Sequence, residues 1–153
     1  MLLVLLVVFI AIQFFRPEKN INTTAAATAN DISKVFSVPN NIQTILKTSC
    51  YDCHSNNTVY PWYATIQPAA WWLKDHVDEG KKEVNFNEFA SYSPRRQFKK
   101  FEELKEEVEE EEMPLSSYKL IHKNAILSKE QSATLTEWAT AQQNSIFVYE
   151  FIR

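Results

Sequence analysis

The residues with the clearest chemistry lie in the stretch Cys50-Tyr51-Asp52-Cys53-His54. Two thiols are separated by two residues, and an imidazole follows the second thiol directly. Thiols at this spacing can add across the vinyl groups of a porphyrin, and the adjacent histidine can then bind the iron from one side. The stretch therefore predicts one covalently attached c-type haem, with thioether bonds to Cys50 and Cys53 and with His54 as the proximal iron ligand.

Three other chemistries use a pair of cysteines at this spacing. A structural disulfide would leave the adjacent histidine unexplained. A zinc site could combine Cys50 and Cys53 with two of His54, His76 and His122, but the second paired half that closes such sites is missing. A redox-active dithiol belongs in a βαβ context, which the sequence does not show. Because both cysteines of the chain lie in this motif, we favour the haem interpretation.

The composition predicts a single small all-α domain. The chain has 153 residues and only one glycine, and tight β-turns depend on the positive φ angles that glycine allows. Ten Phe, six Tyr and four Trp can supply the core. The net charge of -3 indicates neither a nucleic-acid partner nor a polybasic membrane patch. We expect a cytochrome c-like domain of four to five short helices around the haem.

The N-terminal residues 1–16 form an apolar segment followed by charged residues. We interpret it as a transmembrane anchor or uncleaved signal, although its apolar run is shorter than the about 20 residues of a usual span. The small residues Ala25-Ala26-Ala27 offer a cleavage site as the alternative, and a buried core helix is a third interpretation. Bacteria attach haem covalently outside the cytoplasm. The expected location is the periplasmic side of the bacterial inner membrane, or the soluble periplasm after cleavage.

Residues 17–37 are polar and small, so we expect a flexible tether before a haem-binding domain over 38–153. Helix-start signals in this domain are Asn40 or Asn41, Pro68, Ser93 followed by proline, and Ser128 with Gln131 as a capping box. The first predicted helix runs directly into Cys50. The second covers 69–79 and is expected to end at Gly80 in a left-handed C-cap.

The sixth position of the iron has three candidate ligands. Met113 is the only methionine besides Met1, and it stands just past a predicted helix end with Pro114 behind it. We favour Met113 as the distal ligand over a role as core filler. His76 and His122 are the alternatives, because an imidazole could complete a site of lower reduction potential.

Aromatic residues and a glutamate run flank these ligands. Trp62, Tyr63 and Trp72 are predicted to line the haem pocket, although general core packing would also explain them. Eight glutamates lie between residues 102 and 112, directly before Met113. Such a run is usually a solvated helix face, but here it could also steer a basic redox partner toward the haem.

Short motifs along the chain share their residue types and order with one known family. They are Cys50 to Asn56, Pro61-Trp62-Tyr63, Trp72-Leu73, His76-Val77, Gly80, Asn85-Phe86, Glu112-Met113-Pro114, Tyr118, His122, Leu127-Ser128 and Trp138. Together they resemble the small bacterial haem-binding domain proteins, which are single-haem, cytochrome c-like proteins behind an N-terminal membrane segment. The resemblance extends over about Phe14 to Gln143, and it implies Met113 as the distal ligand. In class I cytochromes c the helix before the haem-attachment motif usually carries a glycine and aromatic pair. The corresponding helix of this chain lacks that pair.

Two functions are compatible with these features. The first is a one-electron carrier of the cell envelope, with a six-coordinate haem, a redox protein as partner and no enzymatic activity. The second is a sensor in which a gas or peroxide displaces the distal ligand. We favour the electron carrier.

Overall fold

The structure, a computed structural model, describes the backbone of residues 1–151 and the side chains of residues 1–146. Within residues 1–151 it contains seven α-helices and no strand, which confirms the all-α prediction. The helices are α1 (Leu2–Ile12), α2 (Asn40–Ser49), α3 (Tyr51–His54), α4 (Ala69–Glu83), α5 (Pro94–Glu109), α6 (Ser116–Ile121) and α7 (Lys129–Phe151). Short 3-10 turns are η1 (Ala25–Thr28), η2 (Ile32–Lys34), η3 (Trp62–Thr65), η4 (Phe89–Ser91) and η5 (Lys123–Ala125).

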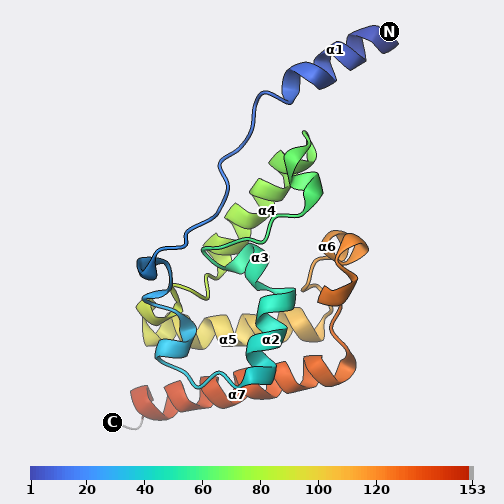
Figure 1. The fold of residues 1–153 in the computed structure, drawn as a ribbon. Helices are drawn as coiled ribbons and strands as arrows, with labels where there is room; N and C mark the ends of the chain where they lie inside the picture. The colour runs from blue at the N-terminus through green and yellow to red at the C-terminus, as the bar shows by residue number, and fades with distance from the viewer. Residues whose placement is uncertain (152–153) are drawn as a thin grey trace.

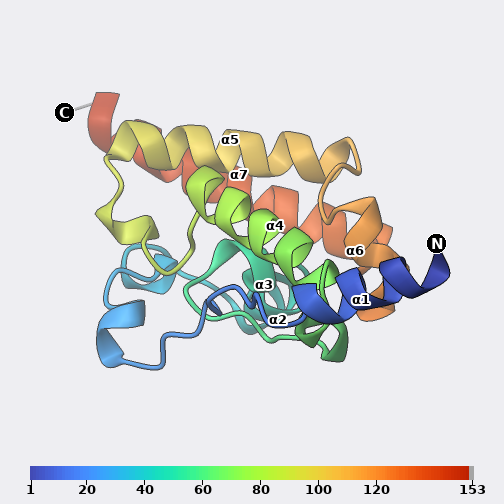
Figure 2. The same cartoon turned by 90° about the horizontal axis from the view of Figure 1, so that it is seen from above.

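Helices α5 and α7 pack along each other (Figure 2) and lie at the end of the domain opposite α1 (Figure 1). Helix α2 contacts α7 and leads directly into α3, which packs against α4 (Figure 1). The main core lies between these helices. Phe101 is fully buried and meets the ring of Trp138 edge-on at 5.5 Å, while the Trp138 indole nitrogen donates to the Ser37 carbonyl at 2.9 Å. Buried aromatic rings thus join α5, α7 and the chain before α2.

Two of the predicted helix starts are confirmed by their side-chain caps. The Ser93 hydroxyl accepts a hydrogen bond from Arg96 N at the start of α5. Ser128 and Gln131 form the predicted capping box, with reciprocal bonds of 2.9 and 3.1 Å. Each bond satisfies a backbone donor that has no partner inside its helix. Helix α2 starts at Asn40 with Pro39 in the N-cap position, so the prediction that Asn40 or Asn41 caps it was wrong.

The prediction that Gly80 ends the second helix was wrong. Helix α4 continues through Gly80 to Glu83, and Gly80 does not have a positive φ. The reason for a glycine lies in packing: a Cβ at this position would stand 2.8 Å from the Cys53 carbonyl oxygen. Gly80 therefore permits α4 to approach α3.

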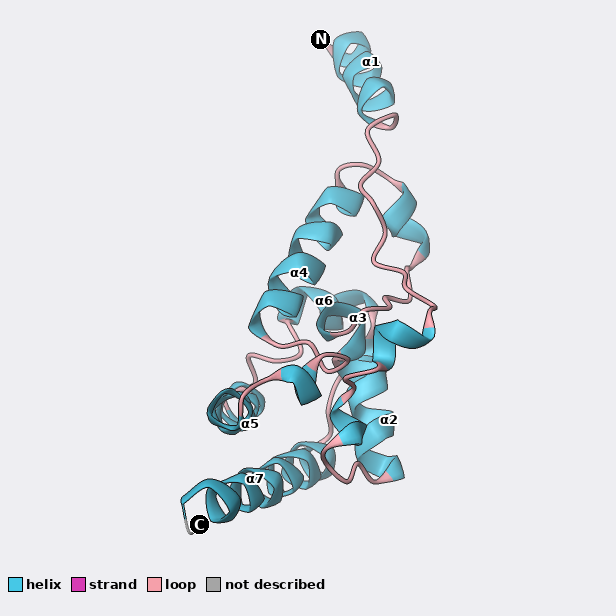
Figure 3. Cartoon of the chain, turned by 90° about the vertical axis from the view of Figure 1, so that its left-hand side faces the viewer, coloured by secondary structure: helices cyan, strands magenta, loops and turns pink. Residues whose placement is uncertain are grey.

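The N-terminal segment forms helix α1, which projects from the rest of the domain (Figures 1 and 3). No helix within residues 1–151 has both the length and the hydropathy needed to cross a membrane. Part of the expected tether packs on the domain: Ile32 is fully buried in the main core, and its N–H donates to the Phe86 carbonyl at 2.8 Å. The Asn20 amide donates to the Ser55 carbonyl at 2.8 Å. The hydrophobic core thus begins before Val38.

Candidate functional site

The two cysteines and the histidine of the motif are brought together by one helical turn. Cys50 ends α2 and caps α3, and its carbonyl accepts bonds from Cys53 N at 3.2 Å and His54 N at 3.0 Å. Residues three and four positions apart lie on the same side of a helix. This spacing allows both thiols and the imidazole to face a single porphyrin, with Cys50 packed against the main core and Cys53 against a small second cluster.

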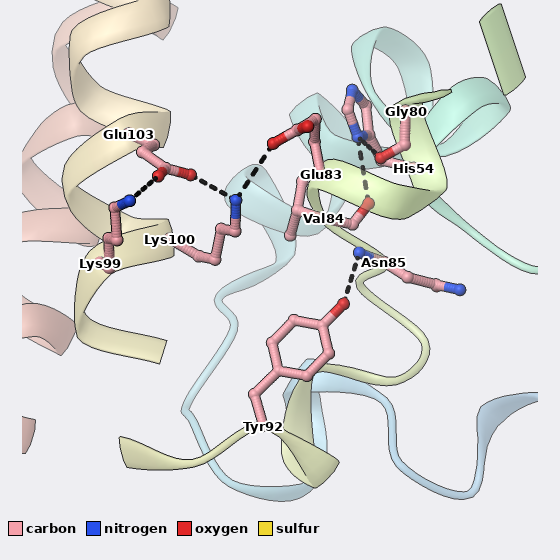
Figure 4. A network of polar contacts seen from close by, with 9 residues as sticks. All are labelled: His54, Gly80, Glu83, Val84, Asn85, Tyr92, Lys99, Lys100 and Glu103. Atoms are coloured by element: carbon pink, nitrogen blue, oxygen red, sulfur yellow. Dashed lines mark hydrogen bonds and ion pairs between the residues drawn. The ribbon is translucent and has the colours of Figure 1, made fainter. Parts of the chain in front are cut away.

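The His54 ring is oriented by the last turn of α4. Its Nδ1 lies 2.8 Å from the Gly80 carbonyl oxygen and 3.1 Å from that of Val84 (Figure 4). Carbonyls only accept hydrogen bonds, so Nδ1 carries the proton and Nε2 keeps its lone pair. In the described part of the chain no group hydrogen-bonds to Nε2. The contacts of Nδ1 thus select the tautomer in which Nε2 can bind a metal.

Burial also favours the metal-binding form of His54. Loss of solvent lowers the pKa of the imidazole below its usual value, and this effect outweighs the two backbone hydrogen bonds, which raise it. At neutral pH the ring is therefore neutral. A neutral imidazole with a protonated Nδ1 is the form that binds iron through Nε2.

A polar network holds the end of α4 in place. Lys100 of α5 pairs with Glu83 of α4 at 3.3 Å and also with Glu103 of its own helix (Figure 4). Just after α4, the Asn85 N–H donates to the Tyr92 hydroxyl at 3.0 Å. The Lys100 side chain is 12% exposed and that of Glu83 is 72% exposed, so solvent screens this pair from the Glu83 side and its contribution is modest. The carbonyls that orient His54 are therefore supported from α5 and from the chain after α4.

The thiols do not have the properties of a redox-active dithiol. Burial, with smaller contributions from neighbouring charges, raises the pKa of the Cys50 thiol to about 12 and that of Cys53 to about 11. Redox-active cysteines have lowered pKa values and react as thiolates at neutral pH. The zinc alternative also finds no support, because the described side chains of residues 1–146 contain no cluster of three or more His, Cys, Asp or Glu placed to hold a metal.

The three aromatic residues predicted for the pocket lie in different surroundings. Tyr63 is buried in a small apolar cluster with Leu73 and Val77, and Cys53 packs against this cluster. Trp62 is 75% exposed and meets the Tyr63 ring edge-on at 5.9 Å. Trp72 is 43% exposed. The structure thus brings Tyr63 to the motif, and the pocket role of all three stays a prediction.

The candidate distal ligands differ in how they are held. His76 lies on α4 with its ring 4.1 Å from that of Trp72, and its Nδ1 hydrogen-bonds to the Trp72 carbonyl. His122 Nε2 lies 2.9 Å from the Tyr63 hydroxyl. Met113 is half-buried and follows the end of α5, where its N–H donates to the Glu107 carbonyl at 3.0 Å. Its bond to Pro114 is cis.

Sequence reasoning missed the contact between Tyr118 and Asp52. The Tyr118 hydroxyl donates to Asp52 Oδ2 at 2.6 Å, which joins α6 to the residue between the two cysteines. Burial and this hydrogen bond raise the pKa of Tyr118, so the phenol remains a donor. The two residues are 66 positions apart, and neither belongs to a local motif that would predict the pair.

A family model described as haem-binding domain matches residues 7–141. The chain belongs to the haem-binding domain family. This confirms the resemblance found in the sequence. No curated protein and no solved structure matches the chain.

The residues of this haem-binding domain fit the group that the family binds. Two thiols and one imidazole lie within one helical turn, and His54 Nδ1 is the donor to both carbonyls. Large apolar side chains on the chain that follows the motif and on α6 are exposed: Val59 is 77% exposed, Trp62 75% and Leu120 71%. An apolar macrocycle bound at α3 would supply a surface against which such side chains can be buried. Haem binding thus agrees with both the donor set and its surroundings.

Replacing Gly80 with alanine tests the contact between α4 and α3. In an ordinary helix interior this change stabilises by about 0.5–1 kcal/mol. Here the new Cβ would collide with the Cys53 carbonyl, so we expect destabilisation by about 1–3 kcal/mol. Chemical denaturation of the wild-type and Gly80→Ala proteins measures the difference.

Asp75→Ala is the matched control, because Asp75 is an exposed residue of the same helix. It should change the free energy of unfolding by less than about 0.5 kcal/mol. A Gly80→Ala protein as stable as the wild type would show that α4 does not need the glycine.

Proposed function

We propose that this haem-binding domain carries one covalently attached haem c and works as a one-electron carrier, with no enzymatic activity. The orientation of His54 supports the proposal most directly. Its Nδ1 bonds to Gly80 and Val84 leave Nε2 as the ligating atom, in the same helical turn as both thiols.

Each residue of the motif has a distinct task in this proposal. Haem supplies the one-electron couple when it is bound. The S–H groups of Cys50 and Cys53 would each add across one vinyl double bond, which forms a C–S bond and releases no leaving group. His54 would be the proximal ligand, and its bonds to backbone carbonyls increase the donor strength of Nε2. A ligand held by backbone atoms moves little when the charge of the site changes.

Met113 is the distal ligand in this proposal. Its backbone is tied to α5, and the segment after it is tied to α3 through Tyr118. His122 uses Nε2 in the contact with Tyr63, and His76 packs on Trp72. A thioether ligand raises the reduction potential of the iron relative to a second imidazole.

The location follows from the proposed attachment. Covalent attachment in bacteria occurs outside the cytoplasm, so we place the domain on the periplasmic side of the inner membrane. The large apolar side chains of α1 from Leu2 to Ile10 are 46–84% exposed, which supports attachment of this helix to the membrane. Cleavage and a soluble periplasmic domain is the alternative.

Covalent attachment can be tested on the full chain produced together with a bacterial haem-attachment system. We expect a haem-stained band on a denaturing gel and an intact mass increased by one haem. The Cys50→Ser and Cys53→Ser variants should each keep one thioether bond and a stained band, whereas the double variant should lose the stain. A wild-type chain that loses its haem on denaturation would contradict covalent attachment.

The distal ligand can be tested by spectroscopy of the Met113→Ala variant. The oxidised wild type should show the weak near-infrared sulfur-to-iron band, and the variant should lack it. The potential should fall by on the order of a tenth of a volt, within the roughly 0.8 V range that axial ligands cover. The reduced variant should also bind carbon monoxide.

His76→Ala and His122→Ala are the controls, and both should retain the near-infrared band. If one of them instead removes the low-spin spectrum, that histidine is the distal ligand. Ready binding of carbon monoxide by the reduced wild type would favour the sensor function.

A basic redox partner is part of the proposal, because the end of α5 carries exposed carboxylates next to Met113. The exposed residues are Glu106, Glu107, Glu109, Glu110, Glu111 and Glu112. Raising the ionic strength from about 0.01 to 0.15 M shortens the screening length from about 30 to 8 Å. We expect stopped-flow oxidation by a cationic cobalt complex to slow with salt, and oxidation by ferricyanide to speed up.

The control replaces Glu109, Glu110 and Glu112 with glutamine, which should weaken both salt effects. Equal salt dependence in this variant and the wild type would show that the end of α5 does not steer small redox partners.

A further inference from the structure

Helix α6 is joined to the haem-attachment motif by a single short hydrogen bond. The Tyr118 hydroxyl donates to Asp52 Oδ2 at 2.6 Å. The Asp52 carboxylate is already oriented by the chain that follows the motif, since its Oδ1 accepts from Val59 N at 3.0 Å. In addition, the Asp52 carbonyl accepts from the Thr58 hydroxyl at 2.6 Å. Tyr118 thus meets an acceptor that is held in place independently of α6.

A second contact joins the same part of the chain to η3. The His122 ring stacks on the Tyr118 ring at a centroid distance of 4.1 Å and an interplanar angle of 8°. His122 Nε2 and the Tyr63 hydroxyl lie 2.9 Å apart and hydrogen-bond to each other. The stack restrains Tyr118 in the position from which it reaches Asp52.

Met113 lies between these contacts and the end of α5. On the α5 side its N–H donates to the Glu107 carbonyl, and the Lys119 ammonium donates to the Glu111 carbonyl at 3.2 Å. On the other side the only bond from residues 113–121 to α3 that the described structure contains is that of Tyr118. Tyr118 lies five positions after Met113, and Asp52 lies two positions before His54. The bond is therefore a short route between the two proposed iron ligands.

We propose that the bond between Tyr118 and Asp52 is a latch that keeps the segment carrying Met113 closed over the distal side of the iron. The inference rests on the proposed function and makes Tyr118 a positioning residue. A bond from a phenol to a carboxylate is among the stronger hydrogen bonds of proteins, because one partner carries a full charge. Its loss should increase the fraction of molecules with an open distal position by about 10-fold.

Imidazole, added to the oxidised haem-loaded full chain, measures this open fraction. An external ligand binds only to the open form, so its apparent dissociation constant is the intrinsic constant divided by the open fraction. We expect Tyr118→Phe to bind imidazole about 10-fold more tightly than the wild type. Asp52→Ala should have a similar effect, and the double variant should be no tighter than either single one. Asp52→Asn keeps an acceptor oxygen and should restore part of the closure.

Two controls separate the latch from a general loss of stability. Ser93→Ala removes the hydroxyl that caps α5, at the end of that helix remote from Met113, and should leave imidazole binding unchanged. Tyr118→Phe placed in a Met113→Ala background should also have no effect, because the distal position is then open already.

The outcomes distinguish the latch from the proposed function. If the wild type holds covalent haem but Tyr118→Phe binds imidazole as the wild type does, the latch is wrong and the electron carrier stands. Tighter binding that persists in the Met113→Ala background would also overturn the latch. A wild type without covalent haem would overturn both.

Discussion

The site depends on the contact between the His54 imidazole and the C-terminal end of α4. The carbonyls of Gly80 and Val84 lie at the negative end of the α4 dipole, and an N–H donor is the favoured partner there. This contact sets the tautomer, the orientation and the donor strength of the ring at once. It requires α4 to lie against α3, which in turn requires the single glycine of the chain at position 80.

The motif is supported by a core that does not include the proposed pocket. Phe89, Phe101, Leu135 and Trp138 belong to the main cluster, whereas Tyr63 belongs to a small second cluster next to Cys53. Helices α2, α5 and α7 can therefore hold the motif while η3 and α6 keep apolar side chains in solvent. This division matches a domain in which the protein organises the proximal side and the cofactor completes the distal one.

The features that depend on neighbouring residues in the chain were predicted from the sequence. The motif, the cap at Ser93 and the capping box at Ser128 follow from residues close together in the chain, and the all-α class follows from the composition. The role of Gly80 could not be predicted in this way, because the same residue suits a C-cap and a close helix contact. The end of α5 shows the opposite mismatch. The residue with a left-handed backbone conformation there is Glu111, and no glycine in the sequence marks this position. The bond between Tyr118 and Asp52 depends on tertiary packing alone.

The burial of the chain before α2 determines the order in which processing and folding can occur. Ala27 is only 4% exposed, and its carbonyl accepts a hydrogen bond from the Asn56 amide at 3.0 Å. A peptidase must bind the residues around the scissile bond in an extended form, which the folded segment does not offer. Any cleavage after Ala27 would therefore have to occur while the chain is still unfolded. If the mature protein began after Ala27, the chain must have been cleaved before Ile32 packed into the core.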